Sequence, residues 1–300
     1  MISICIPIHN YDVTSLVNSL HSQCIEANID FEIILIDDFS EKNFREINSK
    51  LSLISNYIQL DNNVGRSRIR NLFLQYAKYE YLLFLDCDSI INNNFIDNYL
   101  DSIIENNSEV FIGGRIYPSI KPDKNYLLRW KYCTLREQTN YPSSNKAFMS
   151  NNFLIKKELF EKIKFDERIK IYGHEDTLFG YELKKAGIKI KYINNPVLNG
   201  ELESNNEFLN KTENSIENLK YILDFLNYDK GFINEVSLLK SYFFLKRYKL
   251  DLLVHLIFKL KKRALKWLLE KGIVFLWWFD FYKLGYLTTI MKSRNKVKSS

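Results

Sequence analysis

The sequence predicts an α/β fold with a mostly parallel central sheet, followed by a helical C-terminal region. Short apolar runs alternate with segments whose apolar residues recur at helical spacing, from the N-terminus to about residue 193. From about residue 205 the helical spacing continues to the end of the chain. The 300 residues are 46% hydrophobic, which is enough for one large α/β domain with an appendage.

Seven short runs rich in β-branched and other apolar residues are predicted as strands. They lie at residues 2–8, 31–37, within 51–60, and at 81–86, 109–117, 147–155 and 188–193. Helices are expected over 12–27, 64–78, 95–106 and 174–186, and Gly187 ends the last of them. Because strands and helices alternate, helices are expected on both faces of the sheet, in three layers. Residues 118–147, which contain three prolines, are predicted to be irregular.

Charge is unevenly distributed along the chain. The net charge is +6, but residues 236–300 carry 15 Lys and Arg against 3 Asp and Glu, so the remainder is acidic. A basic segment of this kind indicates a partner of its own. Residues 252–287 interleave Lys and Arg with Trp, Phe and Leu, and the longest apolar run, 272–279, is too short to cross a bilayer.

Two interpretations of the basic segment stay open. Its helices either lie on an anionic membrane surface through residues 240–300, or close the domain with their aromatic residues as core. Nucleic acid is not expected as a partner, because no recognisable nucleic-acid-binding module accompanies the basic residues. His255 is expected to be a packed helix residue and not a ligand.

The cysteines and the N-terminus indicate a compartment. The four cysteines form no C-x-x-C pair, so neither a disulfide framework nor a zinc site is expected, and a reducing cytoplasm is favoured. Residues 1–12 have no basic region and no cleavage site, so they are predicted as a first strand and not as a signal peptide.

Acidic side chains follow two of the predicted strands. Asp37 and Asp38 end one, and Asp86 and Asp88 end the other in the stretch YLLFLDCDSII. Parallel sheets bind ligands at the carboxyl ends of their strands, and alternate residues of an extended segment point the same way. Asp86 and Asp88 can therefore converge on a divalent cation, Mg²⁺ or Mn²⁺, which commonly shares such ligands with substrate phosphates. Taken alone, this D-x-D pattern favours the simpler explanation that Asp residues end strands.

Two predicted helices begin with charged residues. Arg66 and Arg70 share a face near the start of the helix 64–78, where a phosphate group is also favoured by the helix dipole. His174, Glu175 and Asp176 begin the helix 174–186, and a carboxylate there can accept a proton from an incoming hydroxyl group. Each feature has a structural alternative: a solvated helix face in the first case, and acids that stabilise a first turn in the second.

The order of these motifs resembles that of the family 2 glycosyltransferases, which have the GT-A fold. The motifs are SICIPIHNYD, EIILIDDFS, NNVGRSRIRN, YLLFLDCDS, FMSNNFLIKKELFEKI and GHEDTLFGYELKKAG, within about residues 1–200. The resemblance implies a GT-A, Rossmann-like catalytic domain over 1–204, with a C-terminal helical region over 205–300. It implies an inverting transfer of a sugar from a nucleotide diphosphate donor, expected to be a UDP-sugar, to a glycan or lipid-linked acceptor hydroxyl.

The resemblance also implies roles for individual residues. Asp38 is expected to contact the base, uracil, and Asp88 to bind Mn²⁺ or Mg²⁺ directly, with Asp86 as a second metal ligand or nearer the ribose or sugar. Asp176 is implied as the catalytic base, with Glu175 as its neighbour. The implied nucleotide-binding residues are Pro7, Ile8, Asn10, Tyr11, Asp37, Asp38, Arg70 and Asp86.

One position departs from the family pattern. Many relatives carry a His after the last core strand that serves as a further metal ligand, whereas this chain has Asn199 at about that place. An amide is a poorer transition-metal ligand than imidazole, and Glu201 is an alternative ligand two residues further on. Acceptor contacts are expected on position alone. The candidates are Arg115, Trp130, Arg136, Glu137 and His174.

Two other classes of protein fit the sequence less well. A sugar-phosphate nucleotidyltransferase would carry a Gly-rich phosphate loop after its first strand, and IPIHNYDVT has none. A catalytically inactive nucleotide- or glycan-binding scaffold of the same fold would lack the metal or base acids, and Asn199 is its only support. The sequence therefore predicts a cytoplasmic, metal-dependent glycosyltransferase of polysaccharide or other glycan synthesis, peripheral on the inner face of the plasma membrane if its helices bind there.

Overall fold

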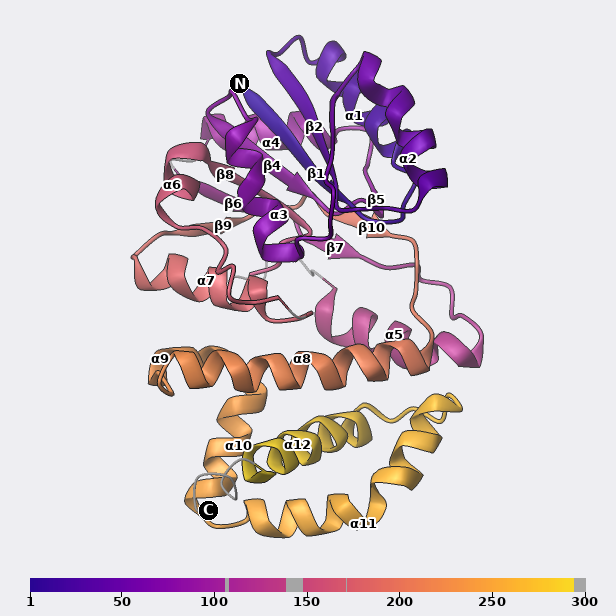
Figure 1. Cartoon of the computed structure of the whole chain (residues 1–300), viewed down its shortest axis with the longest axis vertical. Helices are drawn as coiled ribbons and strands as arrows, with labels where there is room; N and C mark the ends of the chain where they lie inside the picture. The colour runs from indigo at the N-terminus through magenta and orange to yellow at the C-terminus, as the bar shows by residue number, and fades with distance from the viewer. Residues whose placement is uncertain (106–107, 139–147, 171, 294–300) are drawn as a thin grey trace. The chain divides into compact units, whose positions relative to one another are not determined.

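The computed structural model describes residues 1–105, 108–138, 148–170 and 172–293 (Figure 1). The chain forms two compact units. The first comprises Met1–Pro118, Gln138–Lys170 and Leu178–Glu201, and the second comprises Ser119–Glu137, Ile171–Thr177 and Leu202–Ser300. The domain boundary expected between residues 204 and 205 stays a prediction.

A seven-stranded sheet forms the centre of the first unit, in the order β3-β2-β1-β4-β8-β6-β9. β8 runs antiparallel to its neighbours β4 and β6, and the other pairs are parallel, so the prediction of a mostly parallel sheet is confirmed. The strands are β1 (Ile2–Ile8), β2 (Phe31–Asp37), β3 (Asn56–Gln59), β4 (Tyr81–Leu85), β6 (Val110–Ile112), β8 (Asn152–Lys156) and β9 (Ile190–Tyr192).

Helices cover both faces of this sheet, as predicted. Side chains alternate along β1, so Ile4 and Ile6 pack in the layer with α1 and α4, whereas Cys5 packs in the layer with α3, α6 and α7. The helices of this part of the chain are α1 (Thr14–Glu26), α2 (Lys42–Ser49), α3 (Arg66–Leu72), α4 (Phe95–Glu105), α6 (Lys157–Lys162) and α7 (Glu175–Lys185).

The prediction of one strand over 109–117 is wrong, because the chain changes sheets at Gly113 and Gly114. A Cβ atom at Gly113 would lie 2.4 Å from Nδ2 of Asn152, and Gly114 has a φ of 81°, a conformation that glycine adopts without strain. The residues beyond them enter a three-stranded sheet with the order β5-β10-β7. Its strands are β5 (Ser89–Ile90), β7 (Arg115–Ile116) and β10 (Val197–Asn199).

The prediction of irregular structure over 118–147 is wrong for residues 124–137. A short 3₁₀ turn leads into α5 (Leu127–Tyr132), and a π-helical turn follows it. Leu127 and Leu128 of α5 pack with Phe208 and Leu209, and these distant contacts stabilise a helix too short to form alone. Residues 139–147 of the stretch lie outside the described residues, as does the first residue of the strand expected over 147–155.

Three other boundaries differ from the prediction. The helix expected over 64–78 ends at Leu72 and continues as a 3₁₀ turn. The strand expected within 51–60 begins only at Asn56, after another 3₁₀ turn. The strand expected over 147–155 begins at Asn152. In each case the adjoining turn or loop contains apolar residues, which extend the apolar pattern in the sequence beyond the end of the regular element.

The second unit consists of helices. Its capping box, in which Ser204 and Glu207 bond each other's backbone N–H groups, begins the first long helix, α8. All four tryptophans of the chain, at positions 130, 267, 277 and 278, belong to this unit. Of the described helices, none combines the length and apolar character needed to cross a membrane. Besides α5, the helices are α8 (Asn205–Phe225), α9 (Lys230–Glu235), α10 (Ser237–Arg247), α11 (Asp251–Glu270) and α12 (Leu276–Ser293).

Candidate active site

Asp86, the first acid after β4, is held by a buried arginine. Nη2 of Arg70 donates a hydrogen bond of 3.0 Å to Oδ1 of Asp86, and the Arg70 side chain is only 3% exposed. Nη1 of Arg70 donates to the carbonyl oxygen of Arg66 at 3.2 Å, and the guanidinium lies 5.4 Å from the ring centre of Phe165. Arg70, which was predicted to bind the nucleotide, therefore contacts the first acid of the D-x-D motif directly.

Asp88, the second acid of the motif, is held by an amide. Nδ2 of Asn199 donates a hydrogen bond of 2.8 Å to Oδ2 of Asp88. Antiparallel pairing of β10 with β5 sets Asn199 opposite Ser89, next to Asp88 in the chain, so sheet register produces this contact. Burial, followed by the negative charge of Asp86, raises the pKa of Asp88, while the Asn199 hydrogen bond opposes that rise.

These residues fit a divalent cation that is shared with a substrate. A bound cation would relieve the repulsion between Asp86 and Asp88, which adds to burial in raising the pKa of Asp88. In the part of the chain that the structure describes, no three His, Cys, Asp or Glu side chains form a complete metal site. The pair of carboxylates fits a cation such as Mg²⁺, which commonly takes its other ligands from water and phosphate groups. Direct ligation by Asn199 or Glu201 stays a prediction.

The loop after β1 lies beside the same acids. Burial, then the charges of Glu201 and Asp88, raise the pKa of Tyr11 to about 12. Asn10 has a φ of 52°, and its Oδ1 accepts a hydrogen bond from the backbone N–H of Glu41 at 2.7 Å. Pro7 and Ile8 end β1 itself, which neighbours β4 in the sheet.

Asp37 and Asp38 have different surroundings after β2. Asp37 is fully buried, and its carboxylate accepts hydrogen bonds from the Ser40 backbone N–H at 2.7 Å and the Tyr57 hydroxyl at 3.0 Å. Asp38 accepts from the backbone N–H groups of Val64 at 2.6 Å and of Gly65 at 3.2 Å. Asp38 thus anchors the loop that leads into α3 and its arginines. Contacts of either acid with a nucleotide stay predictions.

Glu175 and Asp176 form the first turn of α7 and belong to the second unit. Oε2 of the buried Glu175 accepts a hydrogen bond from the Gly173 N–H at 3.2 Å. Oδ1 of Asp176 accepts from the N–H of Thr177 at 2.6 Å, and Asp176 is half-buried. The two acids are therefore distinct: Glu175 shapes the turn, whereas Asp176 keeps part of its surface accessible.

The turn before this pair is fixed by α8. Gly173 has a φ of 102°, and a Cβ atom there would lie 2.5 Å from Oγ of Ser215, so only glycine fits without movement. The side chain of Asn218 donates a hydrogen bond to the Gly173 carbonyl oxygen. Burial lowers the pKa of His174 from 6.5 to about 4, so its imidazole is neutral at neutral pH.

Several residues predicted to contact an acceptor have partners inside the second unit. Arg136 pairs with Asp280 at 3.1 Å, and Glu137 pairs with Arg129 at 3.1 Å. Trp130 packs against the core of the same unit. Acceptor contacts stay predictions for the whole set, which is Arg115, Trp130, Arg136, Glu137 and His174.

Asn151 is a candidate that the sequence reasoning missed. Its carbonyl oxygen accepts a hydrogen bond from the Asp86 N–H at 3.0 Å, which places it next to the D-x-D motif. Its side chain is buried, and Oδ1 has no hydrogen-bond partner among the described residues. A buried polar atom in that condition is a candidate for a ligand contact. The available signal was the pair of asparagines just before an apolar run, in SNNFLI.

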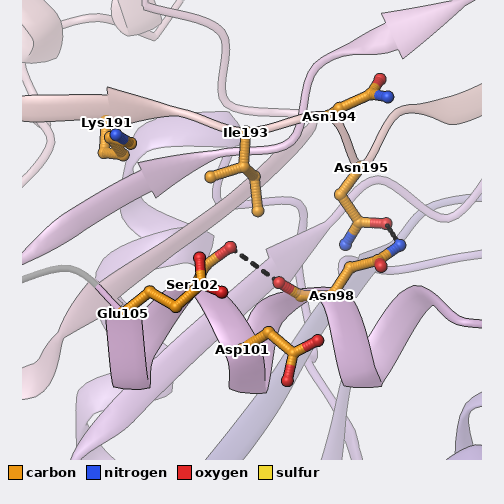
Figure 2. A pocket seen from close by; sticks show the side chains of 8 residues that line it. All are labelled: Asn98, Asp101, Ser102, Glu105, Lys191, Ile193, Asn194 and Asn195. Atoms are coloured by element: carbon orange, nitrogen blue, oxygen red, sulfur yellow. Dashed lines mark hydrogen bonds between the residues drawn. The ribbon is translucent and has the colours of Figure 1, made fainter.

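A cavity of about 300 Å³ lies elsewhere in the first unit (Figure 2). Helix α4 provides one wall, where Asn98 donates from Nδ2 to Oδ1 of Asn195 at 3.0 Å and accepts from Ser102 at its carbonyl oxygen. Asp101 and Glu105 add two acids to its lining. None of the predicted site residues lines this cavity, so it is separate from the candidate site.

The sheet has helices on both faces and carboxylates at the carboxyl ends of β2 and β4, which is the edge where α/β proteins of this type bind their ligands. The chain belongs to glycosyltransferase family 2, because the model described as "Glycosyl transferase family 2" matches residues 3–164, more than half of its length. The family prediction is confirmed, and with it membership of a family of sugar-transferring enzymes.

Two chondroitin synthases are among the similar proteins. The chain is 29% identical over 204 residues to that of Pasteurella multocida (strain Pm70), and 29% identical over 229 residues to that of Escherichia coli. These matches cover 56% and 64% of this chain, but only 21% and 33% of the two synthases. The crystal structure of S. aureus TarS 1–349 in complex with UDP-GlcNAc is similar over 98% of this chain and 91% of that one, with a TM-score of 0.53 and 19% identity. The predicted GT-A fold is thereby confirmed.

Proposed function

We propose that the chain transfers a sugar, with inversion, from a UDP-sugar to a hydroxyl group of a glycan or lipid-linked acceptor. The observation that carries the proposal is the grouping of Asp86, Asp88 and Arg70 at the end of β4 in a member of this family. The TarS complex with UDP-GlcNAc supports a UDP-linked donor, and the chondroitin synthases support a role in polysaccharide or other glycan synthesis.

The residues after β4 would act on the leaving group. Breaking the bond between sugar and phosphate leaves negative charge on the diphosphate. Asp88 and Asp86 would hold a Mn²⁺ or Mg²⁺ ion, which would stabilise such charge. Arg70 keeps Asp86 in position through its hydrogen bond, and Asn199 does the same for Asp88. The nucleotide would lie along the loop after β1 and near Asp38, as the family pattern implies.

Asp176 would act on the acceptor. A carboxylate within reach of the attacking hydroxyl group can accept its proton as that group bonds to the anomeric carbon. The partly accessible side chain of Asp176 suits this role, and the buried Glu175 holds the turn beside it. Attack from the face opposite the leaving diphosphate inverts the anomeric centre, so an α-linked donor gives a β-linked product.

A lipid-linked acceptor would be met at a membrane. We therefore propose a cytoplasmic protein that associates peripherally with the inner face of the plasma membrane. We also propose residues 1–204 as the catalytic domain and 205–300 as the helical region that makes this association.

The test is release of nucleoside diphosphate from a panel of UDP- and GDP-sugars with Mn²⁺ or Mg²⁺, and then with a chelator. Asp88→Ala and Asp176→Asn are measured alongside Asp101→Asn, which changes an exposed acid of the separate cavity. The expected result is metal-dependent release from one donor that both site variants lose and Asp101→Asn keeps. If the protein neither turns over nor binds any nucleotide with either metal, the proposal fails.

An inactive nucleotide- or glycan-binding scaffold of the same fold is the alternative. The observation that favours it is Asn199, at about the place where many relatives carry a metal-binding His. Nucleotide binding without turnover of any donor, even with candidate acceptors added, would support the scaffold. Nucleotide binding alone does not separate the two functions, whereas under the scaffold alternative Asp176→Asn has no effect on the role of the protein.

A further inference from the structure

Helix α11 has two apolar faces, and the described part of the chain covers only one of them. Phe258 and Leu269 are buried in the core of the second unit, where α11 packs against α12 and α8. Residues on the opposite side of the helix recur at spacings of three, four and seven, so they share one face. The large apolar residues of this outer face are Leu253, Leu256, Leu260 and Trp267, with exposed fractions of 55, 57, 82 and 55%.

Exposed apolar residues continue at both ends of α11. Leu250 lies just before the helix, and Ile273, Phe275 and Trp277 follow it, all of them exposed. Figure 1 shows α11 at the edge of the helical unit, with α12 along its inner side. Isolated exposed apolar residues are ordinary on protein surfaces, but a continuous run of this length marks an interaction surface.

The borders of the outer face are basic. Lys259, Lys261 and Arg263 are exposed, and in the described part of the chain none of them has a carboxylate within ion-pair distance. Two other lysines of the helix are occupied, since Lys262 and Lys266 lie 4.0 and 3.4 Å from Glu213. The uncompensated positive charge therefore lies beside the exposed apolar residues.

We propose that the outer face of α11 binds an anionic phospholipid surface, with the helix lying in the plane of the headgroups. Apolar side chains and Trp would enter the interface, while Lys and Arg reach the acidic headgroups with their long stems against the apolar layer. A second copy of the chain fits less well, because pairing two outer faces brings basic borders together. This proposal deepens the proposed function. It rests on that function for the idea that the acceptor is presented at a membrane, whereas the lipid-binding surface itself does not depend on it.

The experiment measures sedimentation of the full chain with vesicles of phosphatidylcholine alone, and with about 30 mol% phosphatidylglycerol. Binding is expected to the anionic vesicles, to weaken with added salt, and to shift tryptophan emission to shorter wavelength. A Lys259→Gln, Lys261→Gln, Arg263→Gln variant should bind about a hundredfold more weakly, because the loss of each basic residue weakens binding about fivefold and the three losses multiply. A Leu256→Ser, Leu260→Ser, Trp267→Ser variant should lose binding to the anionic vesicles.

The matched control changes exposed apolar residues of the first unit. Leu53 and Ile104 are 93% and 83% exposed, so Leu53→Ser with Ile104→Ser should bind vesicles as the unchanged chain does. The proposal is overturned if the full chain does not bind anionic vesicles, or if both outer-face variants bind unchanged. It is equally overturned if light scattering shows a dimer that the apolar variant dissociates, since the face would then join two copies. Vesicle binding needs neither donor nor acceptor, so its failure is distinct from failure of the transferase proposal.

Discussion

Replacing Arg70 with Met is expected to destabilise the first unit and to release Asp86. The change removes a 3.0 Å hydrogen bond to Asp86 from a guanidinium that is 3% exposed, while the Asp86 side chain is 31% exposed. Breaking a fully buried ion pair costs about 3–5 kcal/mol, but water reaches Asp86 here. We therefore expect a loss of about 1.5–3 kcal/mol, the range for hydrogen bonds to charged groups.

The assay is hydrogen exchange of the β4 amides, which reports on this sheet directly, whereas all four tryptophans lie in the second unit. A double-mutant cycle with Asp86→Asn isolates the pair, and calorimetry with UDP and Mn²⁺ tests whether positioning Asp86 matters for the ligand. Arg68→Met, an exposed change on the same helix, is the control and should stay within about 0.5 kcal/mol. A coupling energy below about 0.5 kcal/mol would refute the reasoning.

Three further predictions test the packing and the titration of buried groups. Asn152→Ala should lower the free energy of unfolding by about 3 kcal/mol or more, because it removes the hydrogen-bond partner of the Tyr99 hydroxyl and of two backbone carbonyl groups. An unchanged thermal midpoint of unfolding would contradict this. Since burial lowers the pKa of His174 from 6.5 to about 4, the stability tied to its neutral form is complete above about pH 6.5 and is lost as the pH falls towards 4. His174→Gln should flatten that fall in urea titrations followed by tryptophan fluorescence, and an identical pH dependence would show that another group is responsible. Gly285→Ala should cost about 1–3 kcal/mol in the same assay, because the new Cβ would lie 2.3 Å from ring carbons of Phe258, and a neutral result would mean that the ring moves freely.

The strands of the sheet centre were predictable because parallel strands are buried on both faces. Residues 2–8 and 31–37 are continuous apolar runs, and the structure has β1 and β2 over those residues. The break at Gly113 was not predictable, because it depends on the approach of Asn152 and Asn195, which lie far away in the chain. Likewise, α5 depends on contacts of Leu127 and Leu128 with the second unit's core, which no local pattern reveals.

The candidate site divides in the same way. The acids after β4 and the arginines of α3 are visible as short motifs, because residue type and strand end are local features. The hydrogen-bond partners of these side chains are not visible in the sequence, since Arg70 contacts Asp86 only through the packing of a helix on a sheet. Asn199 meets Asp88 across 111 residues of sequence through strand register, so the sequence indicated a departure from the family but not a hydrogen-bond donor.

The second unit is assembled from three separate stretches of the chain, which crosses between the units at five points. Leu127 and Leu128 come from one stretch, while Phe208 and Leu209, which pack with them, come from another. Recombination that appends or removes only the end of the gene would therefore divide this core instead of exchanging it whole. The two units are therefore expected to evolve together. A gene that gained new C-terminal helices would need matching changes in the segments around residues 119–137 and 171–177.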